Sequence, residues 1–243
     1  MKILIIGESC KDIFHYGYCK RLCPEAPVPV FNSSGIVENG GMAKNTYNNV
    51  VALGASADLI TNENWELISK TRFVDKRTNH MFMRLDENDT GYGKCDLSQI
   101  RFRDYEAIIV SDYDKGFLSI EDLQIISVKH HLTFLDTKKK LGNWCKNFTF
   151  IKINNIEYER TLDSIDSDIN QKLIITQGPN GCLYQNKPYE VPLVEVKDTS
   201  GAGDTFVASM CVKYCESSNI EESLKFANHC ATVVVQKKGV ATI

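Results

Sequence analysis

Short runs of apolar residues, several of them β-branched, recur along the chain between longer segments of mixed polarity. Runs of this length suit buried strands, and the segments between them are long enough to form helices. An alternation of strand and helix is typical of a doubly wound, mostly parallel sheet with helices on both faces. The predicted strands are Lys2 to Ile6, Ala107 to Val110, Leu132 to Leu135, Phe148 to Ile153 and Lys172 to Thr176.

Helices are predicted in the segments that separate these strands. The last of them should end before Gly239, because a glycine that follows two lysines has the chemistry of a helix stop. Gly40 to Leu53 should contain the first helix, and the others are expected at Ser119 to His130, Thr205 to Tyr214 and Asn219 to Lys238.

Two further segments, about residues 13–37 and 73–86, have a strand-like but more polar pattern. Prolines at positions 24, 27 and 29 suit an edge strand or a loop and do not suit a central strand. No low-complexity linker or internal repeat separates these segments from the remainder. A single domain of residues 1–243 is therefore predicted, with both segments inserted into it.

Composition narrows the class of protein. The chain has 243 residues, and a hydrophobic content of 43% is enough for one sizeable core. A net charge of −3 argues against nucleic-acid binding, and no apolar run approaches the roughly 20 residues that span a membrane. Nine cysteines without a signal peptide favour a reducing, cytoplasmic location, and their spacing does not match a zinc site.

The stretch Asp198 to Phe206 is the strongest candidate for chemistry. Gly201, Ala202 and Gly203 lack bulky side chains and precede a predicted helix, so free backbone N–H groups and the helix dipole form an anion hole. Asp204 lies at its mouth, where it can act as general base and accept the proton of an attacking hydroxyl. The alternative is a simple glycine-rich turn capped by an aspartate.

A nucleotide site is expected at the end of the predicted strand that finishes at Thr176. Ligands bind at the carboxyl ends of strands in open α/β sheets, so Thr176, Gly178 and Gly181 are assigned to ATP. The phosphate-binding pattern GxxxxGK[ST] is absent, which leaves phosphate binding to the anion hole. The five histidines form no nucleophile arrangement.

The stretch from Asp198 to Phe206 resembles the C-terminal signature of the ribokinase-like carbohydrate kinases, the PfkB family. Further blocks are similar, in the same order, to the heptose 7-phosphate kinase domain of the ADP-heptose pathway. These blocks are Arg21 to Val30, Arg84 to Asp86, Ser111 to Gly116, Leu135 to Lys138, Asn154 to Glu157 and Thr176 to Gly178.

The resemblance implies a ribokinase-like fold with a small β lid over the sugar, ATP and Mg²⁺ as cofactors, and a homodimer through the lid. It implies that Asp12, Gly40, Gly41, Asn45 and Lys138 bind the sugar, that Lys152, Asn154 and Asn228 bind the nucleotide, and that Asn154 and Glu157 organise Mg²⁺. The chain is shorter than the family pattern between Ile60 and Phe73, so the lid is expected to be shortened.

A sugar that already carries a phosphate needs a cationic clamp. Arg84 is assigned to the substrate site, and Lys11, Arg21, Lys44, Lys76 and Arg77 are the other candidates. Thr137 replaces the proline of the family's DPK block, and Asp114 replaces a small residue in its SDYxKG block. One extra residue after Gly40-Gly41 leaves open whether Lys44 or Asn45 faces the sugar.

The sequence therefore predicts an ATP-dependent kinase that phosphorylates the anomeric hydroxyl of a heptose 7-phosphate. No HxGH-type nucleotidyltransferase pattern is present, so a separate protein is expected to form the nucleotide sugar. Two alternatives stay open. The substrate could be another sugar or sugar phosphate, or the chain could be a non-catalytic protein that binds a phosphosugar or nucleotide.

Overall fold

A computed structural model describes all 243 residues, which form a large sheet, its covering helices and a second, smaller sheet. The large sheet has eight strands in the order β12-β11-β10-β9-β8-β7-β1-β4, parallel except for β11 and β12 at one edge. Its strands are β1 (Lys2–Gly7), β4 (Ser56–Ile60), β7 (Ala107–Asp112), β8 (Thr133–Thr137), β9 (Phe150–Asn154), β10 (Leu173–Thr176), β11 (Cys182–Tyr184) and β12 (Lys187–Tyr189).

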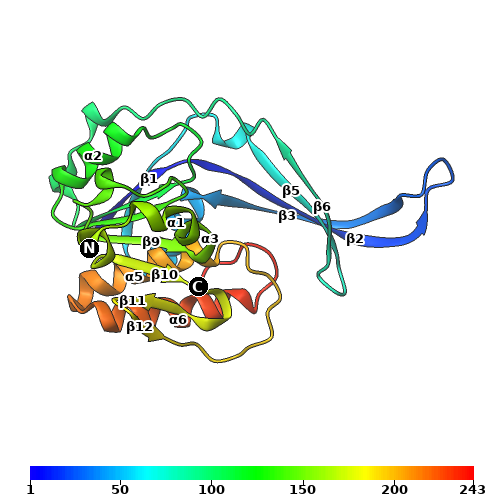
Figure 1. Cartoon of the computed structure of the whole chain (residues 1–243). Coiled ribbons are helices and arrows are strands. Elements are labelled where there is room, and N and C mark those ends of the chain that lie inside the picture. The colour runs from blue at the N-terminus through cyan, green and yellow to red at the C-terminus, as the bar shows by residue number, and fades with distance from the viewer.

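Helices cover both faces of this sheet, and Figure 1 shows α2 on one side of it and α5 and α6 on the other. The helices are α1 (Ala43–Ala52), α2 (Ile120–Lys129), α3 (Asn155–Thr161), α4 (Ser167–Asn170), α5 (Ala202–Ser217) and α6 (Ile220–Val235). Short 3₁₀ helices are found at Trp65–Leu67, Leu97–Gln99, Phe102–Asp104, Asn143–Cys145, Leu162–Ser164 and Gly178–Asn180.

Successive residues of the central strands enter two different cores. On β1, Leu4 and Ile6 pack into the core beneath α2, whereas Ile3 and Ile5 pack into the core beneath α1, α5 and α6. Parallel strands that are buried on both faces must be apolar throughout, which is why their sequences are continuous apolar runs. The prediction of a doubly wound α/β fold is confirmed.

The predicted helices are also present, with shifted ends. Ser119 caps α2 in a capping box with Asp122, as the prediction of a helix from Ser119 to His130 requires. The last helix, α6, ends at Val235 instead of continuing to Lys238. The carbonyl of Val235 accepts hydrogen bonds from the backbone N–H groups of Lys197 and Asp198, so it is not free to continue the helix.

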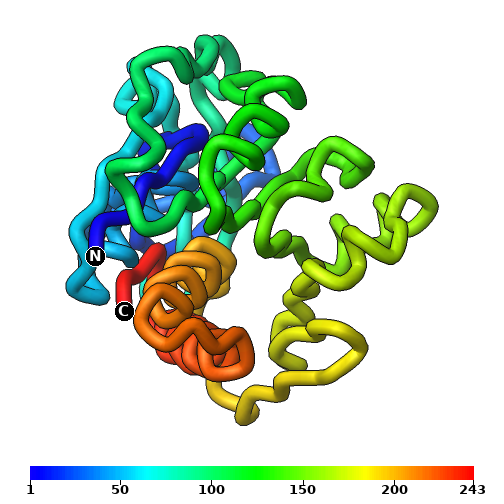
Figure 2. The backbone as a smooth tube through the Cα atoms, turned by 90° about the vertical axis from the view of Figure 1, so that its left-hand side faces the viewer, coloured from blue at the N-terminus to red at the C-terminus, as the bar shows by residue number.

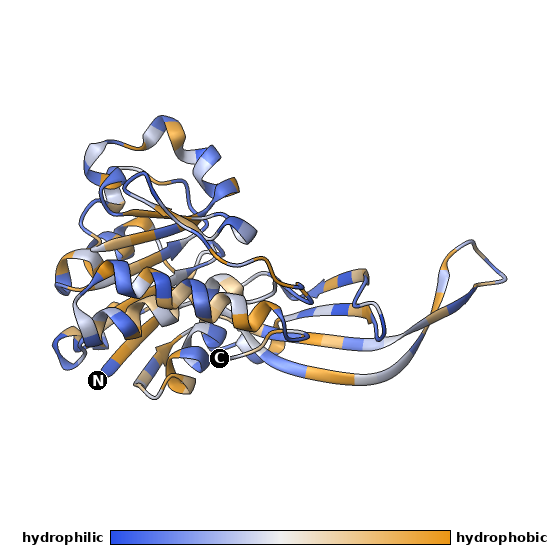
Figure 3. Ribbon diagram, turned by 90° about the horizontal axis from the view of Figure 1, so that it is seen from below, coloured by the Kyte–Doolittle hydropathy of each residue, from blue (hydrophilic) through white to orange (hydrophobic).

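The second sheet has the order β3-β2-β5-β6, and its long hairpin of β2 and β3 projects from the body (Figure 1). Its strands are β2 (Ser9–Leu22), β3 (Pro29–Met42), β5 (Ser69–Asp75) and β6 (Met81–Glu87). Polar and apolar positions alternate along much of the projecting part (Figure 3). The sheet includes the predicted segments 13–37 and 73–86 but begins earlier in both, because Ser9 to Asp12 and Ser69 to Arg72 already pair across it.

The three prolines of this segment lie in a turn and on an edge strand, as predicted. Pro24 and Pro27 are in the turn of the hairpin, and Pro29 is the first residue of the edge strand β3. Between β4 and β5 the chain contains only the 3₁₀ helix at Trp65–Leu67, which is the expected shortening of this region. None of the helices has the length and apolar character needed to cross a bilayer.

The second sheet is attached to the C-terminal segment of the chain. Phe14 of β2 and Val74 of β5 pack with Val240 in a small core of their own. The Lys238 side chain donates a hydrogen bond of 2.7 Å to the carbonyl of Lys76. Figure 2 shows the C-terminal helices from a second direction, packed against each other at one side of the body. The position of this sheet therefore depends on residues from both ends of the sequence.

Candidate active site

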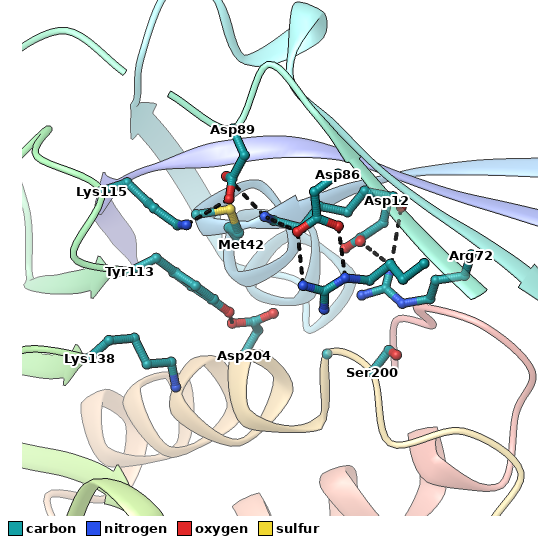
Figure 4. A pocket seen from close by; sticks show the side chains of 13 residues that line it. Asp12, Met42, Arg72, Asp86, Asp89, Tyr113, Lys115, Lys138, Ser200 and Asp204 are labelled. Atoms are coloured by element: carbon teal, nitrogen blue, oxygen red, sulfur yellow. Dashed lines mark hydrogen bonds and ion pairs between the residues drawn. The ribbon is translucent and has the colours of Figure 1, made fainter. Parts of the chain in front are cut away.

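A polar cavity of about 350 Å³ lies between the second sheet and the first turn of α5 (Figure 4). The second sheet contributes Asp12, Lys70, Arg72, Arg84 and Asp86 to its wall, and the body contributes Tyr113, Lys115, Lys138, Gly201 and Asp204. Most of the body residues follow the carboxyl ends of parallel strands or begin a helix. This is the edge of an α/β sheet at which ligands bind.

Asp204 is buried in the first turn of α5, and both of its carboxylate oxygens accept a hydrogen bond. Asn45 Nδ2 donates to Oδ2 at 3.0 Å, and the Tyr113 hydroxyl donates to Oδ1 at 2.7 Å. Burial raises the pKa of Asp204 from its ordinary value of 3.8 to about 6, although the two hydrogen bonds act in the opposite direction. A carboxyl group with this pKa is mostly ionised at neutral pH and remains a useful proton acceptor.

The start of α5 has the backbone geometry of an anion site. Gly201 is the N-cap residue with a φ of 80°, and no side chain caps the helix. A β carbon at Gly203 would lie 2.9 Å from Lys152 Nζ, so the lysine ammonium lies directly against the first turn. The lysine is paired with Asp136 at 2.8 Å, and the Ala202 N–H donates to the Thr199 carbonyl at 3.2 Å. The N–H groups of Gly201 and Gly203 and the helix dipole favour negative charge at this place.

A second cavity, of about 290 Å³, lies on the other side of the same helix start. Ala202 and Gly203 line it, together with Thr176, Gly178 and Gly181 from the segment after β10. Its remaining wall is largely apolar, with Val191, Pro192, Leu193, Val194, Val196, Phe206 and Val235. An apolar cavity beside an anion site suits a flat aromatic base joined to phosphate groups.

Asn228 also lines the second cavity, but its side chain is already engaged. Its Nδ2 donates to the carbonyl of Tyr189 at 2.6 Å. Gly181 packs closely against the end of β12, since a β carbon at Gly181 would be only 2.1 Å from the Tyr189 carbonyl oxygen. Both residues thus shape the cavity through their packing against β12.

Asn154 and Glu157 form a capping box at the start of α3. The Glu157 carboxylate accepts hydrogen bonds from the Asn154 backbone N–H at 2.8 Å and from its side chain at 2.9 Å, and it also pairs with Lys138. Because both oxygens already have partners, this carboxylate suits a hydrated Mg²⁺ bound through water better than direct coordination. The residues present therefore fit the predicted metal in an outer-shell role.

Each cation of the first cavity is paired with a carboxylate, Lys138 with Glu157 and the other four with aspartates. Arg84 pairs with Asp86 at 2.8 Å, and Lys70 contacts both Asp86 at 3.5 Å and Asp89 at 3.0 Å. Arg72 pairs with Asp12, and Lys115 pairs with Asp89 at 2.7 Å. Four cations share three aspartates along this wall, so it carries an excess of positive charge.

Sequence reasoning selected only Arg84 and Lys138 from the cations of this cavity and missed Lys70, Arg72 and Lys115. The available signal was alternation, since Lys70 and Arg72 are two positions apart on one strand and share a face. The other candidates, Lys11, Arg21, Lys44, Lys76 and Arg77, line neither cavity.

Gly40, Gly41 and Asn45, which were predicted to bind the sugar, lie behind the wall of the first cavity and do not line it. A β carbon at Gly41 would be 2.2 Å from Asp12 Oδ2, so this glycine makes room for the aspartate that reaches the cavity. Asn45 points to Asp204, whereas the Lys44 side chain covers Gly40 and lies over the rings of Tyr47 and Trp65. In this structure neither Lys44 nor Asn45 lines the cavity.

The fold is that of the ribokinase-like proteins. Ribokinase from Thermotoga maritima has a TM-score of 0.71 at 15% identity, with 98% of this chain and 94% of that chain covered. Ribokinase from Arabidopsis thaliana, solved with ribose and ATP, has a TM-score of 0.68 at 16% identity, with 98% of this chain and 93% of that chain covered.

The sequence comparisons name the family. The model of the pfkB family carbohydrate kinases matches residues 148–243, which contain Asn154, Glu157 and the start of α5. The bifunctional protein HldE of Helicobacter acinonychis is 30% identical over an alignment of 295 positions, covering 99% of this chain and 64% of the relative. Over residues 148–243 the chain is therefore similar to the PfkB carbohydrate kinases, and it spans less than two thirds of the length of the relative that it matches.

Proposed function

We propose that the protein transfers the γ-phosphoryl group of ATP to a sugar hydroxyl, with Asp204 as the general base. One observation supports this proposal above the others. The first turn of α5 separates a polar cavity from an apolar one, and residues of this turn line both. An acceptor in the first cavity and a nucleotide in the second would meet at the anion site.

Each residue of the turn then has a role in phosphoryl transfer. Asp204 faces the acceptor cavity and takes the proton from the attacking hydroxyl as the oxygen–phosphorus bond forms. The N–H groups of Gly201 and Gly203 and the Lys152 ammonium stabilise the negative charge on the transferred group. The bond to the leaving oxygen of ADP breaks on the opposite side, toward the apolar cavity.

The nucleotide is expected to contact Thr176, Gly178, Gly181 and Asn228, which line the apolar cavity. Asn154 and Glu157 would hold hydrated Mg²⁺ beside the phosphates, where the ion neutralises charge on them. Lys138 links the two regions, because it lines the acceptor cavity and pairs with Glu157.

The proposed acceptor is D-glycero-D-manno-heptose 7-phosphate, phosphorylated at its anomeric hydroxyl. The excess of cations on the second sheet supports an acceptor that already carries a phosphate group, with Arg72 and Arg84 as bidentate partners. Asp12 would accept hydrogen bonds from sugar hydroxyls. The resemblance of the PEAPVPV and SDYxKG blocks to heptose 7-phosphate kinases supports the choice of sugar.

The second sheet is proposed to act as the lid of this cavity, as in the family that the chain resembles. Exposed apolar side chains on the sheet, Ile36, Val37, Met81, Met83 and Leu85 among them, favour a homodimer that covers them.

The proposal is tested by ATP consumption with Mg²⁺ and a panel of sugars and sugar phosphates. Turnover that requires the heptose phosphate and is lost in Asp204→Asn would support both the proposed acceptor and the role of Asp204 as general base. Turnover of another sugar would keep the mechanism and replace the substrate. ATP binding without turnover of any acceptor would instead favour a non-catalytic binding protein.

A further inference from the structure

The loop that follows β7, residues 113–117, is held by one buried carboxylate. Glu8 Oε2 accepts a hydrogen bond from the backbone N–H of Tyr113 at 2.8 Å, and Oε1 accepts from Lys115 and Phe117 at 3.1 and 3.3 Å. Glu8 itself is fully buried. Three backbone hydrogen bonds to one carboxylate fix the path of the loop, so the Tyr113 side chain leaves it in a defined direction.

That direction is toward Asp204. Figure 4 shows the two side chains pointing at each other, and the Tyr113 hydroxyl donates to Asp204 Oδ1 at 2.7 Å. Lys138 Nζ lies 5.5 Å from the centre of the tyrosine ring, which restrains the ring from one side. Burial and the charge of Asp204 raise the pKa of Tyr113 well above its ordinary value, so its hydroxyl stays protonated and remains a donor.

We propose that Tyr113 is a positioning residue for Asp204, because its hydroxyl holds one carboxylate oxygen and thereby fixes the rotamer of the base. The proposal rests on the function given above. An ionised carboxylate has about four acceptor positions. Tyr113 and Asn45 occupy one on each oxygen, which leaves positions for the acceptor hydroxyl.

Removal of the tyrosine hydroxyl would change the hydrogen bonding of Asp204 without changing any nearby charge. Asp204 has only two hydrogen-bond donors, the neutral side chains of Tyr113 and Asn45. The charged groups that act on it are Asp136 on β8, which raises its pKa, and Lys152 on β9, which lowers it. Lys138, which interacts with the Asp204 charge, and Asp12 lie on the wall of the same cavity. All four are retained in Tyr113→Phe.

The test is Tyr113→Phe, measured in two ways. Loss of one hydrogen bond to the ionised form should raise the acid limb of the kcat/KM profile by about one pH unit. The rate should then fall at every pH, because the base is no longer held in one rotamer, and it should fall about fivefold further near pH 6 than near pH 8. Carbon-13 NMR of protein labelled at the aspartate carboxyls measures the pKa of Asp204 independently of turnover. The Asp204 signal is identified by its absence in Asp204→Asn, and its titration should show the same increase in pKa.

Tyr105→Phe is a matched control. The Tyr105 hydroxyl donates to Asp58 Oδ2, also at 2.7 Å, and neither residue lines a cavity. This variant should leave the pH profile and the Asp204 titration unchanged.

An unshifted Asp204 titration in Tyr113→Phe, or a rate at pH 8 equal to that of the wild type, would overturn the proposal. If the wild-type protein phosphorylates no acceptor, the proposed function fails, yet the NMR titration still decides whether Tyr113 acts on Asp204.

Discussion

Asp204→Asn is expected to make the folded protein more stable at alkaline pH while it removes turnover. The pKa of Asp204 is about 6 in the folded protein, against an ordinary value of 3.8. Between these two values the folded state binds a proton that the unfolded chain has released, so wild-type stability falls as the pH rises through this window. The two pKa values differ by about two units, which corresponds to about 3 kcal/mol above pH 7.

An asparagine at position 204 carries no buried charge and can keep the hydrogen bonds to Asn45 and Tyr113. Its side-chain oxygen can accept from Asn45 Nδ2, and its amide can donate to the Tyr113 hydroxyl, which is able to accept as well as donate. Some of the gain will be lost because these neutral hydrogen bonds are weaker than those to a carboxylate. A net stabilisation of about 2 kcal/mol at about pH 8 is therefore expected.

Urea unfolding of wild type and Asp204→Asn, followed by circular dichroism from about pH 4 to pH 8, measures this difference. The advantage of the variant should be smallest near pH 4, grow through pH 6 and be constant above about pH 7. Asp168→Asn, at an exposed position, should show no such growth. A variant less stable than wild type at pH 8, or an advantage independent of pH, would refute the reasoning.

Three further substitutions test other parts of the site. Gly203→Ala should lower kcat at least tenfold, because the added β carbon would lie 2.9 Å from Lys152 Nζ. Steady-state or stopped-flow kinetics measure kcat, and an unchanged value would contradict the role of this turn. Arg84→Met should raise the KM of a phosphorylated sugar about tenfold and leave that of its unphosphorylated form unchanged, whereas Arg77→Met outside the cavity should change neither. Glu157→Gln can keep the capping box but loses the negative charge, so the Mg²⁺ concentration that gives half the maximal rate should increase. The same Mg²⁺ dependence of the rate in the variant and the wild type would argue against the proposed metal role.

The body of the fold could be predicted from local sequence. Apolar runs such as Ala107 to Val110 are buried on both faces, so the pattern alone defines the strand. The start of α5 could also be predicted, because its glycines and Asp204 are neighbours in the chain. The loop with Gly178 and Gly181 could be placed in the same way, since it follows a strand, whereas the apolar wall at Val191 to Val196 was not predicted.

The wall of the acceptor cavity depends on pairing between distant segments. Arg72 meets Asp12 across 60 residues, and Tyr113 meets Asp204 across 91. The first of these contacts requires the register of β5 against β2. A change of one residue in the pairing of β5 with β2 or of β6 with β5 would turn Arg72 or Arg84 to the opposite face. Local pattern does not determine such a register, which is why sequence reasoning found one of these arginines and not the other.

The ion pairs along this wall make ligand entry an exchange of partners. Each cation that could receive a phosphate already has an aspartate, so an incoming anion must offer more than the carboxylate that it displaces. A singly charged anion offers no additional charge, whereas a phosphate dianion does. The acidic partners are therefore expected to act as a threshold that disfavours monovalent anions and favours doubly charged phosphate esters.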